Sequence, residues 1–111
     1  MKNIGIIGLG YVGLTLGILS AEKGYNVYGV EISEEIVSKL NNNESFFYEP
    51  DIDELIKKHN KKNFNVVSKF TEEMNIEAFI VTVGTPLLEG EKKPNFNYLK
   101  SAIDTIKDVF S

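Results

Sequence analysis

Apolar residues follow two different periods along this chain, and these periods predict strands that alternate with helices. Four short runs rich in β-branched residues match parallel strands buried on both faces; they cover residues 4–7, 26–31, 64–67 and 78–83. Helical patterns or helix-boundary residues lie between and after them, at residues 11–23, 33–40, 50–62, 71–75 and from 95 or 97 onward. The alternation predicts an α/β fold, a doubly wound parallel sheet that ends after about four strands.

Boundary residues support several of these helices. Ser33 suits an N-cap, with Glu34 and Glu35 in the first turn. Pro50 suits the first turn of the next helix, and the basic cluster 57–62 falls at its C-terminal end, where we expect solvated cations. One face of the last helix is apolar at helical spacing; it is formed by Leu99, Ile103, Ile106 and Phe110.

The helix at 11–23 is apolar nearly all round, through Val12, Leu14, Leu16, Ile18 and Leu19. A helix of this kind is normally covered on more than one side. The fourth strand should also present an unpaired edge, which tends to recruit another chain. We therefore expect a homo-oligomer, unless the last helix shields that edge.

Residues 3–21 contain no charge, which imitates a signal peptide or a membrane span. Glycines at positions 5, 8, 10, 13 and 17 interrupt the run, and Glu22 and Lys23 end it. Spanning segments are more continuously apolar, so we expect a cytoplasmic protein with no membrane partner.

Composition restricts the chemistry available to the 111 residues. The length suits one small domain with a single core. The net charge of −4 indicates no basic surface for binding nucleic acid. Cysteine is absent and His59 is the one histidine, so we expect no metal site and no cysteine nucleophile within this chain.

A glycine-rich turn follows the first strand and opens the first helix. Gly8, Gly10 and Gly13 match the GxGxxG fingerprint in the context that gives it meaning. The first glycine permits the tight turn, the second lets the backbone approach a pyrophosphate, and the third lets helix and strand pack closely. Amides near Tyr11 and Val12, at the positive end of the helix, should then face the phosphates. The fold is therefore predicted to be of the Rossmann type.

Glu31 ends the second strand and follows Gly13 at close to the roughly 20-residue spacing expected of the acid that binds the adenosine ribose. The alternative is that Glu31 only begins the next helix. A 2′-phosphate site usually has a neighbouring Arg, and the chain has no Arg. A carboxylate there also repels that phosphate, so the predicted cofactor is NAD and not NADP.

At this point the sequence resembles one family, the UDP-glucose and UDP-N-acetylmannosamine dehydrogenases. The resemblance rests on residues 6–14 with 24–32, on the Glu-Pro segment that begins at Glu49, and on Val83, Gly84, Thr85 and Pro86 with residues 94–99. It implies that Glu31 binds ribose and that the segment from Val83 to Pro86 lines the cofactor cleft. Glu31 and Asn95 stand where the family more often has Asp.

The resemblance also implies what the chain lacks. In the family, two NAD oxidise a sugar C6 alcohol to a carboxylate through a thiohemiacetal on a cysteine, with a Ser-Thr segment, a Glu and a Lys further along the chain. We therefore expect residues 1–111 to form the NAD-binding domain of a longer dehydrogenase, without its substrate domain. By themselves they should be inactive, and a nucleotide sugar would be a partner only in the full enzyme.

Three functions remain open: a nucleotide-sugar dehydrogenase domain, the cofactor domain of another NAD-linked hydroxyacid or sugar-phosphate dehydrogenase, and a stand-alone nucleotide-sensing module. Some segments have two interpretations. Phe46, Phe47 and Tyr48 should pack in the core or loop and not form a partner site. Glu49 is expected to make a local polar contact, whereas Thr85 is expected near the cofactor.

Overall fold

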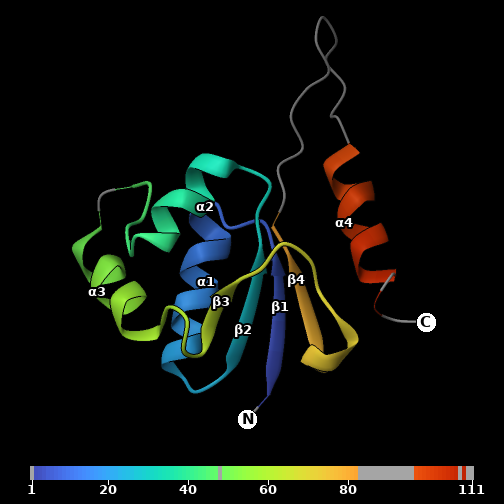
Figure 1. Ribbon diagram of the computed structural model, residues 1–111, viewed down its shortest axis with the longest axis horizontal. Coiled ribbons are helices and arrows are strands. Elements are labelled where there is room, and N and C mark those ends of the chain that lie inside the picture. Colours follow the sequence, from blue (N-terminus) through green and yellow to red (C-terminus); the bar gives the residue numbers. More distant parts are fainter. Residues whose placement is uncertain (1, 48, 83–96, 108, 110–111) are drawn as a thin grey trace, which may run out of the picture.

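The computed structural model describes residues 2–47, 49–82, 97–107 and 109. Its centre is one sheet of four parallel strands in the order β3-β2-β1-β4 (Figure 1). The strands are β1 (Asn3–Ile7), β2 (Asn26–Val30), β3 (Phe64–Val66) and β4 (Ala78–Val81). The chain adds strands on one side of β1 and then crosses to the other side, so the strand order reverses beside β1. That reversal is where open α/β sheets bind their ligands.

Helices cover both faces of the sheet, as the alternating pattern predicts. The helical elements are α1 (Tyr11–Glu22), α2 (Glu34–Asn41), α3 (Pro50–His59), the 3-10 turn η1 (Glu72–Met74) and α4 (Asn97–Lys107). The first three pack on one face, and α4 lies beside β4 (Figure 1). The predicted strands and helices are confirmed, apart from shifts at their ends. The largest is in α3, which ends at His59 and not at residue 62, and β4 ends at Val81.

Each face of the sheet has its own core, because successive side chains of a strand point to opposite sides. Ile6, Val27 and Ile80 face α1 and join the core that α1, α2 and α3 complete. Ile7 faces away, towards Phe70, Ile76 and α4. Burial on both faces explains why the strands are apolar at nearly every position.

Small residues let α1 lie close against the strands. Gly13, Gly17 and Ala21 are buried at four-residue spacing along the helix. A Cβ added to Gly17 would lie 2.9 Å from the Phe64 ring. The opposite side of α1 is uncovered: Val12, Leu16 and Leu19 are 58%, 41% and 47% exposed. The expectation that this helix cannot bury all its apolar residues against one sheet is therefore confirmed.

The packing face of α4 differs from the predicted one. Ala102 is buried, and Ile106 and Val109 pack with it against the sheet, whereas Ile103 is 49% exposed. The helix therefore packs through residues 102 and 106, and Val109 follows just past its end. Phe110 and Asn95 lie outside the described residues.

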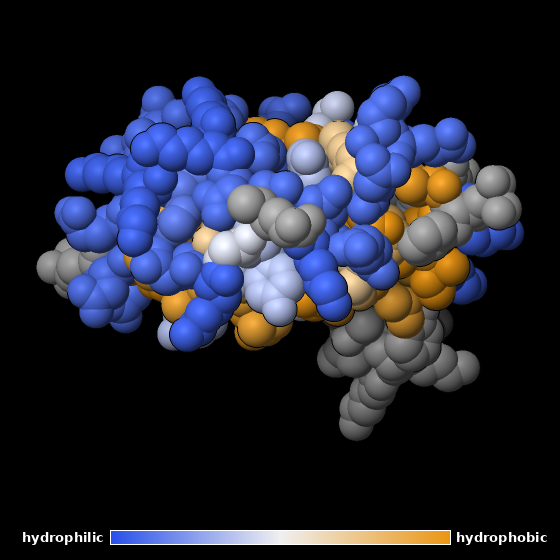
Figure 2. All heavy atoms as spheres, turned by 90° about the horizontal axis from the view of Figure 1, so that it is seen from below, coloured by the Kyte–Doolittle hydropathy of each residue, from blue (hydrophilic) through white to orange (hydrophobic). Residues whose placement is uncertain are grey.

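In a view from below Figure 1, hydrophobic surface shows mainly on the side of β4 and α4, and hydrophilic residues cover the side of α3 (Figure 2).

None of the helices in the described ranges is long and apolar enough to cross a membrane. The cytoplasmic location stays a prediction.

Ser33 caps α2 as expected, its hydroxyl accepting a hydrogen bond from the Ile36 amide. Phe47 packs on the core as predicted, and Phe46 lies against its ring; Tyr48 lies outside the described residues.

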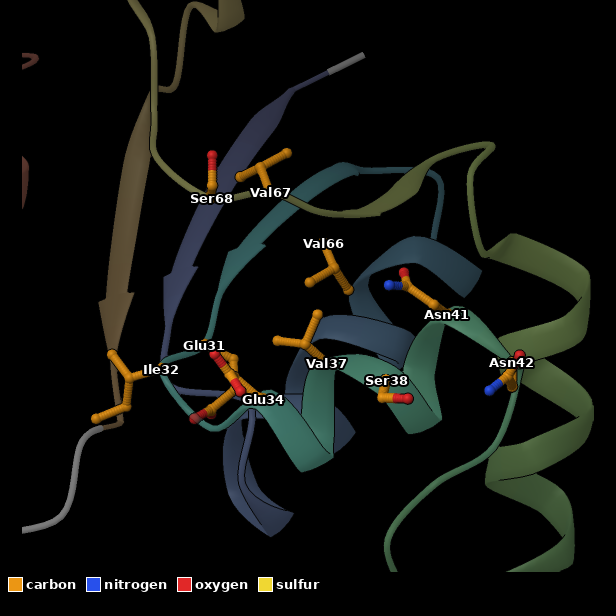
Figure 3. A pocket seen from close by; sticks show the side chains of 10 residues that line it. All are labelled: Glu31, Ile32, Glu34, Val37, Ser38, Asn41, Asn42, Val66, Val67 and Ser68. Carbon is orange, nitrogen blue, oxygen red and sulfur yellow. The ribbon is translucent and has the colours of Figure 1, made fainter.

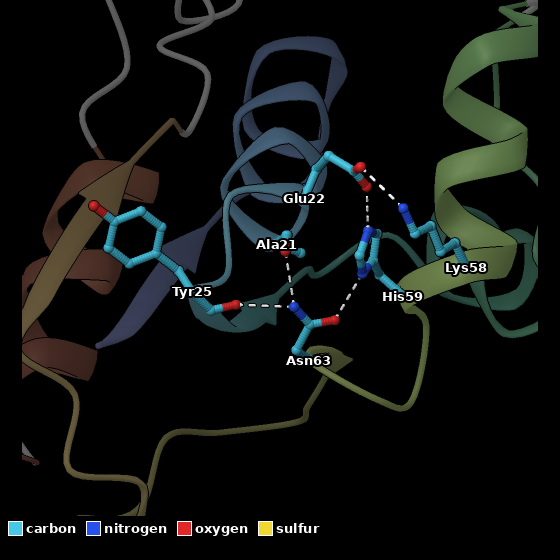
Figure 4. Close-up of polar contacts among 6 residues, drawn as sticks. All are labelled: Ala21, Glu22, Tyr25, Lys58, His59 and Asn63. Carbon is cyan, nitrogen blue, oxygen red and sulfur yellow. Dashed lines mark hydrogen bonds and ion pairs between the residues drawn. The ribbon is translucent and has the colours of Figure 1, made fainter. Parts of the chain in front are cut away.

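His59 is not part of a solvated helix end, so that prediction is wrong for this residue. It is 8% exposed, and its ring joins the C-terminal end of α3 to the C-terminal end of α1 (Figure 4). Nε2 contacts Glu22 Oε2, and Nδ1 lies 2.8 Å from Asn63 Oδ1. Lys58 reaches the other oxygen of Glu22 at 2.9 Å. The neighbouring lysines of the cluster are exposed, as expected.

Asn63 can orient the His59 ring because its own side chain is fixed by hydrogen bonds. Its Nδ2 donates to the carbonyls of Ala21 at 2.8 Å and Tyr25 at 3.2 Å, which turns its Oδ1 towards the ring (Figure 4). Asn60, which is also buried, donates to the Leu40 carbonyl and so fastens α3 to α2. The polar sequence 57–63 thus alternates solvated cations with buried side chains that connect three helices.

This cluster predicts a pH dependence of stability. The hydrogen bond with His59, followed by that with Lys58, lowers the pKa of the Glu22 carboxyl below its ordinary value of 4.5. A carboxyl with a lowered folded pKa stabilises the fold above its unfolded pKa, and this contribution is lost as pH falls through the folded pKa. The melting temperature should therefore drop between about pH 5 and about pH 3, measured by circular dichroism.

The matched variants are Glu22→Gln and Glu35→Gln, the latter at an exposed position of α2. The Glu22 variant should melt lower at neutral pH and show a shallower acid dependence, whereas the Glu35 variant should follow the wild type. Identical acid profiles for wild type and Glu22→Gln would contradict the role given to this contact.

Candidate functional site

The glycine-rich turn lies at the carboxyl end of β1, at the point where the strand order reverses. Gly8 has φ +95°, a backbone conformation that side chains rarely adopt, and its amide donates to the Val30 carbonyl at 2.9 Å. A Cβ at Gly8 would lie 2.7 Å from the carbonyl oxygen of Thr82. Both the conformation and the space at this position therefore require glycine.

Gly10 precedes α1 and is its N-cap residue. Among the residues that the structure describes, a Cβ built on Gly10 would meet nothing within 4 Å. The first turn of α1 contains no acidic residue. By helix geometry, the amides of Tyr11, Val12 and Gly13 have no acceptor within the helix. The positive end of the helix dipole is thus directed at a region that an anion can enter.

Gly13 has the opposite environment. It is buried, and a Cβ there would lie 1.9 Å from the Gly8 carbonyl oxygen and 2.4 Å from Thr82 Oγ1. The helix can begin so close to the turn only because this position has no side chain. The structure therefore agrees with the tight turn predicted at Gly8 and the close packing predicted at Gly13, whereas the role of Gly10 towards a pyrophosphate stays a prediction.

Glu31 lies beside the turn, one residue past the end of β2. Its Oε1 accepts a hydrogen bond of 2.7 Å from the Leu9 amide, and its Oε2 accepts one of 2.8 Å from the Ser33 amide. The carboxylate is half-buried, and it connects the turn to the start of α2. The structure thus brings Glu31 together with the glycine-rich turn, as the spacing predicted, but the two amide contacts were not expected.

A hollow of about 550 Å³ opens next to Glu31 (Figure 3). It lies between α2 and the carboxyl end of β3, and its lining mixes apolar and polar side chains: Glu31, Ile32, Glu34, Val37, Ser38, Asn41, Asn42, Val66, Val67 and Ser68. Ile32 is 74% exposed at one end of the hollow. The carboxylate therefore has the turn on one side and a partly apolar recess on the other.

Thr82 is a residue of this site that the sequence did not reveal. It directly follows β4, its amide donates to the Ile7 carbonyl at 2.8 Å, and its hydroxyl donates to the Gly8 carbonyl at 2.7 Å. A threonine inside a predicted strand gives no signal for this, because the contact depends on β4 lying beside β1.

Not every predicted site residue can be placed. Val83, Gly84, Thr85 and Pro86 lie outside the described residues. Glu49 directly precedes α3, where its carbonyl accepts hydrogen bonds from the amides of Ile52 and Asp53. Within the part of the chain that the structure describes, acidic and histidine side chains do not gather into a group of three that could hold a metal ion.

These features define a class. A parallel sheet that reverses its strand order beside β1, with a glycine turn leading into a helix and an acid just after β2, is a dinucleotide-binding Rossmann domain. The UDP-glucose/GDP-mannose dehydrogenase family, in its NAD binding domain, matches residues 2–111. The chain belongs to this family, whose cofactor is NAD. Membership favours the nucleotide-sugar dehydrogenases over the other NAD-linked dehydrogenases considered above.

Individual relatives agree with this assignment. The chain is similar to UDP-N-acetyl-D-mannosamine dehydrogenase of Methanococcus maripaludis, with 40% identity over 96% of this chain and 25% of the relative. Among solved structures, UDP-D-ManNAc dehydrogenase of Pyrococcus horikoshii is 33% identical, with a TM-score of 0.83 over 98% of this chain and 26% of that one. NDP-N-acetyl-D-galactosaminuronic acid dehydrogenase of Methanosarcina mazei is 27% identical, with a TM-score of 0.80 over 99% and 25%. The chain thus spans about a quarter of the length of these relatives.

The contrast between two glycines gives a prediction about stability. Gly13→Ala places a methyl group against the Gly8 backbone, which cannot move without opening the turn, so we expect unfolding to become easier by about 3 kcal/mol. Gly10→Ala enters open space and should change the free energy of unfolding by less than about 1 kcal/mol. Urea titration followed by circular dichroism measures both. Equal losses in the two variants would contradict the close approach of α1 to the turn.

Proposed function

We propose that this chain binds NAD at the carboxyl end of β1 and is the cofactor domain of an enzyme that oxidises the C6 alcohol of a nucleotide sugar to a carboxylate. The observation that carries the proposal is the pairing of two groups. An unobstructed helix N-terminus lies at Gly10, and an acid beside the same turn lies at Glu31. The first suits a pyrophosphate and the second suits a ribose.

In this proposal the turn holds the phosphates without any cationic side chain. The backbone amides at Tyr11, Val12 and Gly13 donate to the pyrophosphate, and Gly10 allows the close approach. Gly8 provides the shape of the turn through its positive φ. The segment of Val83, Gly84, Thr85 and Pro86 follows Thr82 from the same edge of the sheet, and we assign it to the wall of the cofactor cleft.

Glu31 keeps the acceptor capacity that a ribose needs. Each of its two oxygens accepts one backbone amide, and a carboxylate has about four acceptor positions in all. The remaining positions suit the two hydroxyls of the adenosine ribose. A 2′-phosphate would instead meet a carboxylate with no arginine to offset the repulsion. The neighbouring Ile32 offers exposed apolar surface for a base.

The chemistry that bound NAD supplies is the acceptance of a hydride from the carbon that is oxidised. This chain contributes the binding and orientation of that cofactor. It contains no cysteine, so we propose that the nucleophile and the nucleotide-sugar site implied by the resemblance belong to a further domain. The 111 residues by themselves are then a domain that binds cofactor without turnover.

The proposal is tested by isothermal titration calorimetry with NAD and NADP. The wild type should bind NAD more tightly than NADP. Glu31→Ala should lower the affinity for NAD by about tenfold and reduce the difference in affinity between the two cofactors. Gly10→Val, with its side chain in the space assigned to the pyrophosphate, should abolish detectable binding of both.

Glu35→Ala, at an exposed position of α2 four residues after Glu31, serves as the control and should bind as the wild type does. Thermal melts of all variants establish that each is folded. Tighter binding of NADP than of NAD would refute the role of Glu31. Unchanged NAD binding in Gly10→Val would refute the assignment of the turn.

We also propose that the chain self-associates. Two features support this: the uncovered apolar side of α1, and the position of β4 at the edge of the sheet among the described strands. An unpaired strand edge and exposed apolar surface both favour association. Light scattering over a dilution series should therefore show a mass above that of one chain, decreasing on dilution.

The variants Leu16→Glu and Leu19→Glu separate the two surfaces, because they add charge to α1 without touching β4. A shift to lower mass in these variants assigns the contact to α1, and an unchanged mass assigns it to the strand edge. A monomer at high wild-type concentration would contradict self-association and indicate that α4 shields β4.

A further inference from the structure

One peptide group of the phosphate-binding turn is held at both ends by side chains from the two neighbouring strands. The carbonyl of Gly8 accepts a hydrogen bond of 2.7 Å from Thr82 Oγ1, at the end of β4. The amide of Leu9 donates one of 2.7 Å to Glu31 Oε1, at the end of β2. Because this carbonyl and this amide belong to a single planar unit, the two contacts together fix its orientation.

Local geometry does not fix this peptide by itself. Gly8 has φ +95° and, as glycine, accesses positive and negative φ about equally. The orientation of the Gly8–Leu9 peptide is therefore set by contacts from outside the turn. That orientation in turn determines where the chain enters Gly10 and the first amides of α1.

The hydroxyl of Thr82 has a function that a methyl group of similar size lacks. The Gly8 carbonyl is confined on the helix side, where a Cβ at Gly13 would lie 1.9 Å from its oxygen. A hydroxyl approaches that oxygen to 2.7 Å by donating a hydrogen bond. The distance between a carbon atom and a carbonyl oxygen is at least about 3.3 Å. A methyl group in the place of the Thr82 hydroxyl would therefore push the Gly8 carbonyl away and tilt the peptide.

We propose that Thr82 is a positioning residue for the cofactor site: together with Glu31 it fixes the Gly8–Leu9 peptide, and so directs the amides of the turn at the dinucleotide phosphates. This inference rests on the proposed function. It assigns a role to a side chain that need not touch the cofactor. It also connects Glu31, the proposed ribose ligand, to the end of β4 through one peptide group.

The test compares Thr82→Val with Thr82→Ser in the full chain. Valine keeps the shape and removes the donor, whereas serine keeps the donor. Calorimetry with NAD and ADP-ribose, which contain the pyrophosphate, should show affinity about five- to tenfold lower for the valine variant and near wild type for the serine variant. Adenosine has no phosphate, and NMR titration should show similar binding to all three proteins.

Hydrogen exchange of the Leu9 amide provides a readout that is independent of any ligand. Without cofactor, this amide should exchange faster in Thr82→Val than in wild type or Thr82→Ser, while amides in the middle of β1 remain protected. If the valine variant does not fold, Thr82→Ala is measured in the same way, because it removes the donor and leaves space in place of a conflict.

The outcomes separate the two proposals. Equal affinities of wild type and Thr82→Val for NAD, or a proportional loss for adenosine, overturn the positioning role and leave the NAD proposal standing. Failure of the wild type to bind NAD overturns the proposed function. In that case the Leu9 exchange rates still decide whether Thr82 fixes the turn.

Discussion

The structure depends on one contact between two backbone segments, the approach of Gly13 to the carbonyl of Gly8. A methyl group at Gly13 would lie 1.9 Å from that oxygen, so the distance between α1 and the end of β1 is set by the absence of a side chain. The same closeness confines the Gly8 carbonyl to the side of Thr82, whose hydroxyl donates a hydrogen bond to it at 2.7 Å. The packing of α1 and the orientation of the turn are therefore two results of one constraint.

The order of elements could be predicted from sequence because local signals mark each of them. Apolar runs identify the strands, Ser33 and Pro50 mark helix starts, and the glycine spacing identifies the turn. The position of Glu31 also follows from sequence, since it directly follows a strand that must lie beside β1. These features need only the residues near them and the rule that parallel strands end at the same edge.

The remaining features depend on which elements become neighbours. The sequence places His59 in a solvated lysine cluster, and its contact with Glu22 exists only because α3 packs beside α1. The sequence likewise places Thr82 inside a strand, and its contact with Gly8 exists only because β4 pairs with β1. The packing face of α4 becomes visible only beside the core of Ile7, Phe70 and Ile76, where Ala102 is buried while Ile103 stays exposed. In each case the residues that determine the contact are distant in the sequence, so neither the hydrophobic period nor the motif spacing predicts it.

The segment between β2 and β3 is fastened to α1 at two places. At the far end, His59 contacts Glu22; near the glycine-rich turn, the ring centroids of Phe47 and Tyr11, the first residue of α1, lie 4.6 Å apart. One segment of the chain therefore contacts both the first residue of α1, Tyr11, and its last residue, Glu22. Because Phe47 also packs on the core that α1, α2 and α3 share, the helix that follows the glycine-rich turn is held at its two ends by side chains that are not part of the fingerprint.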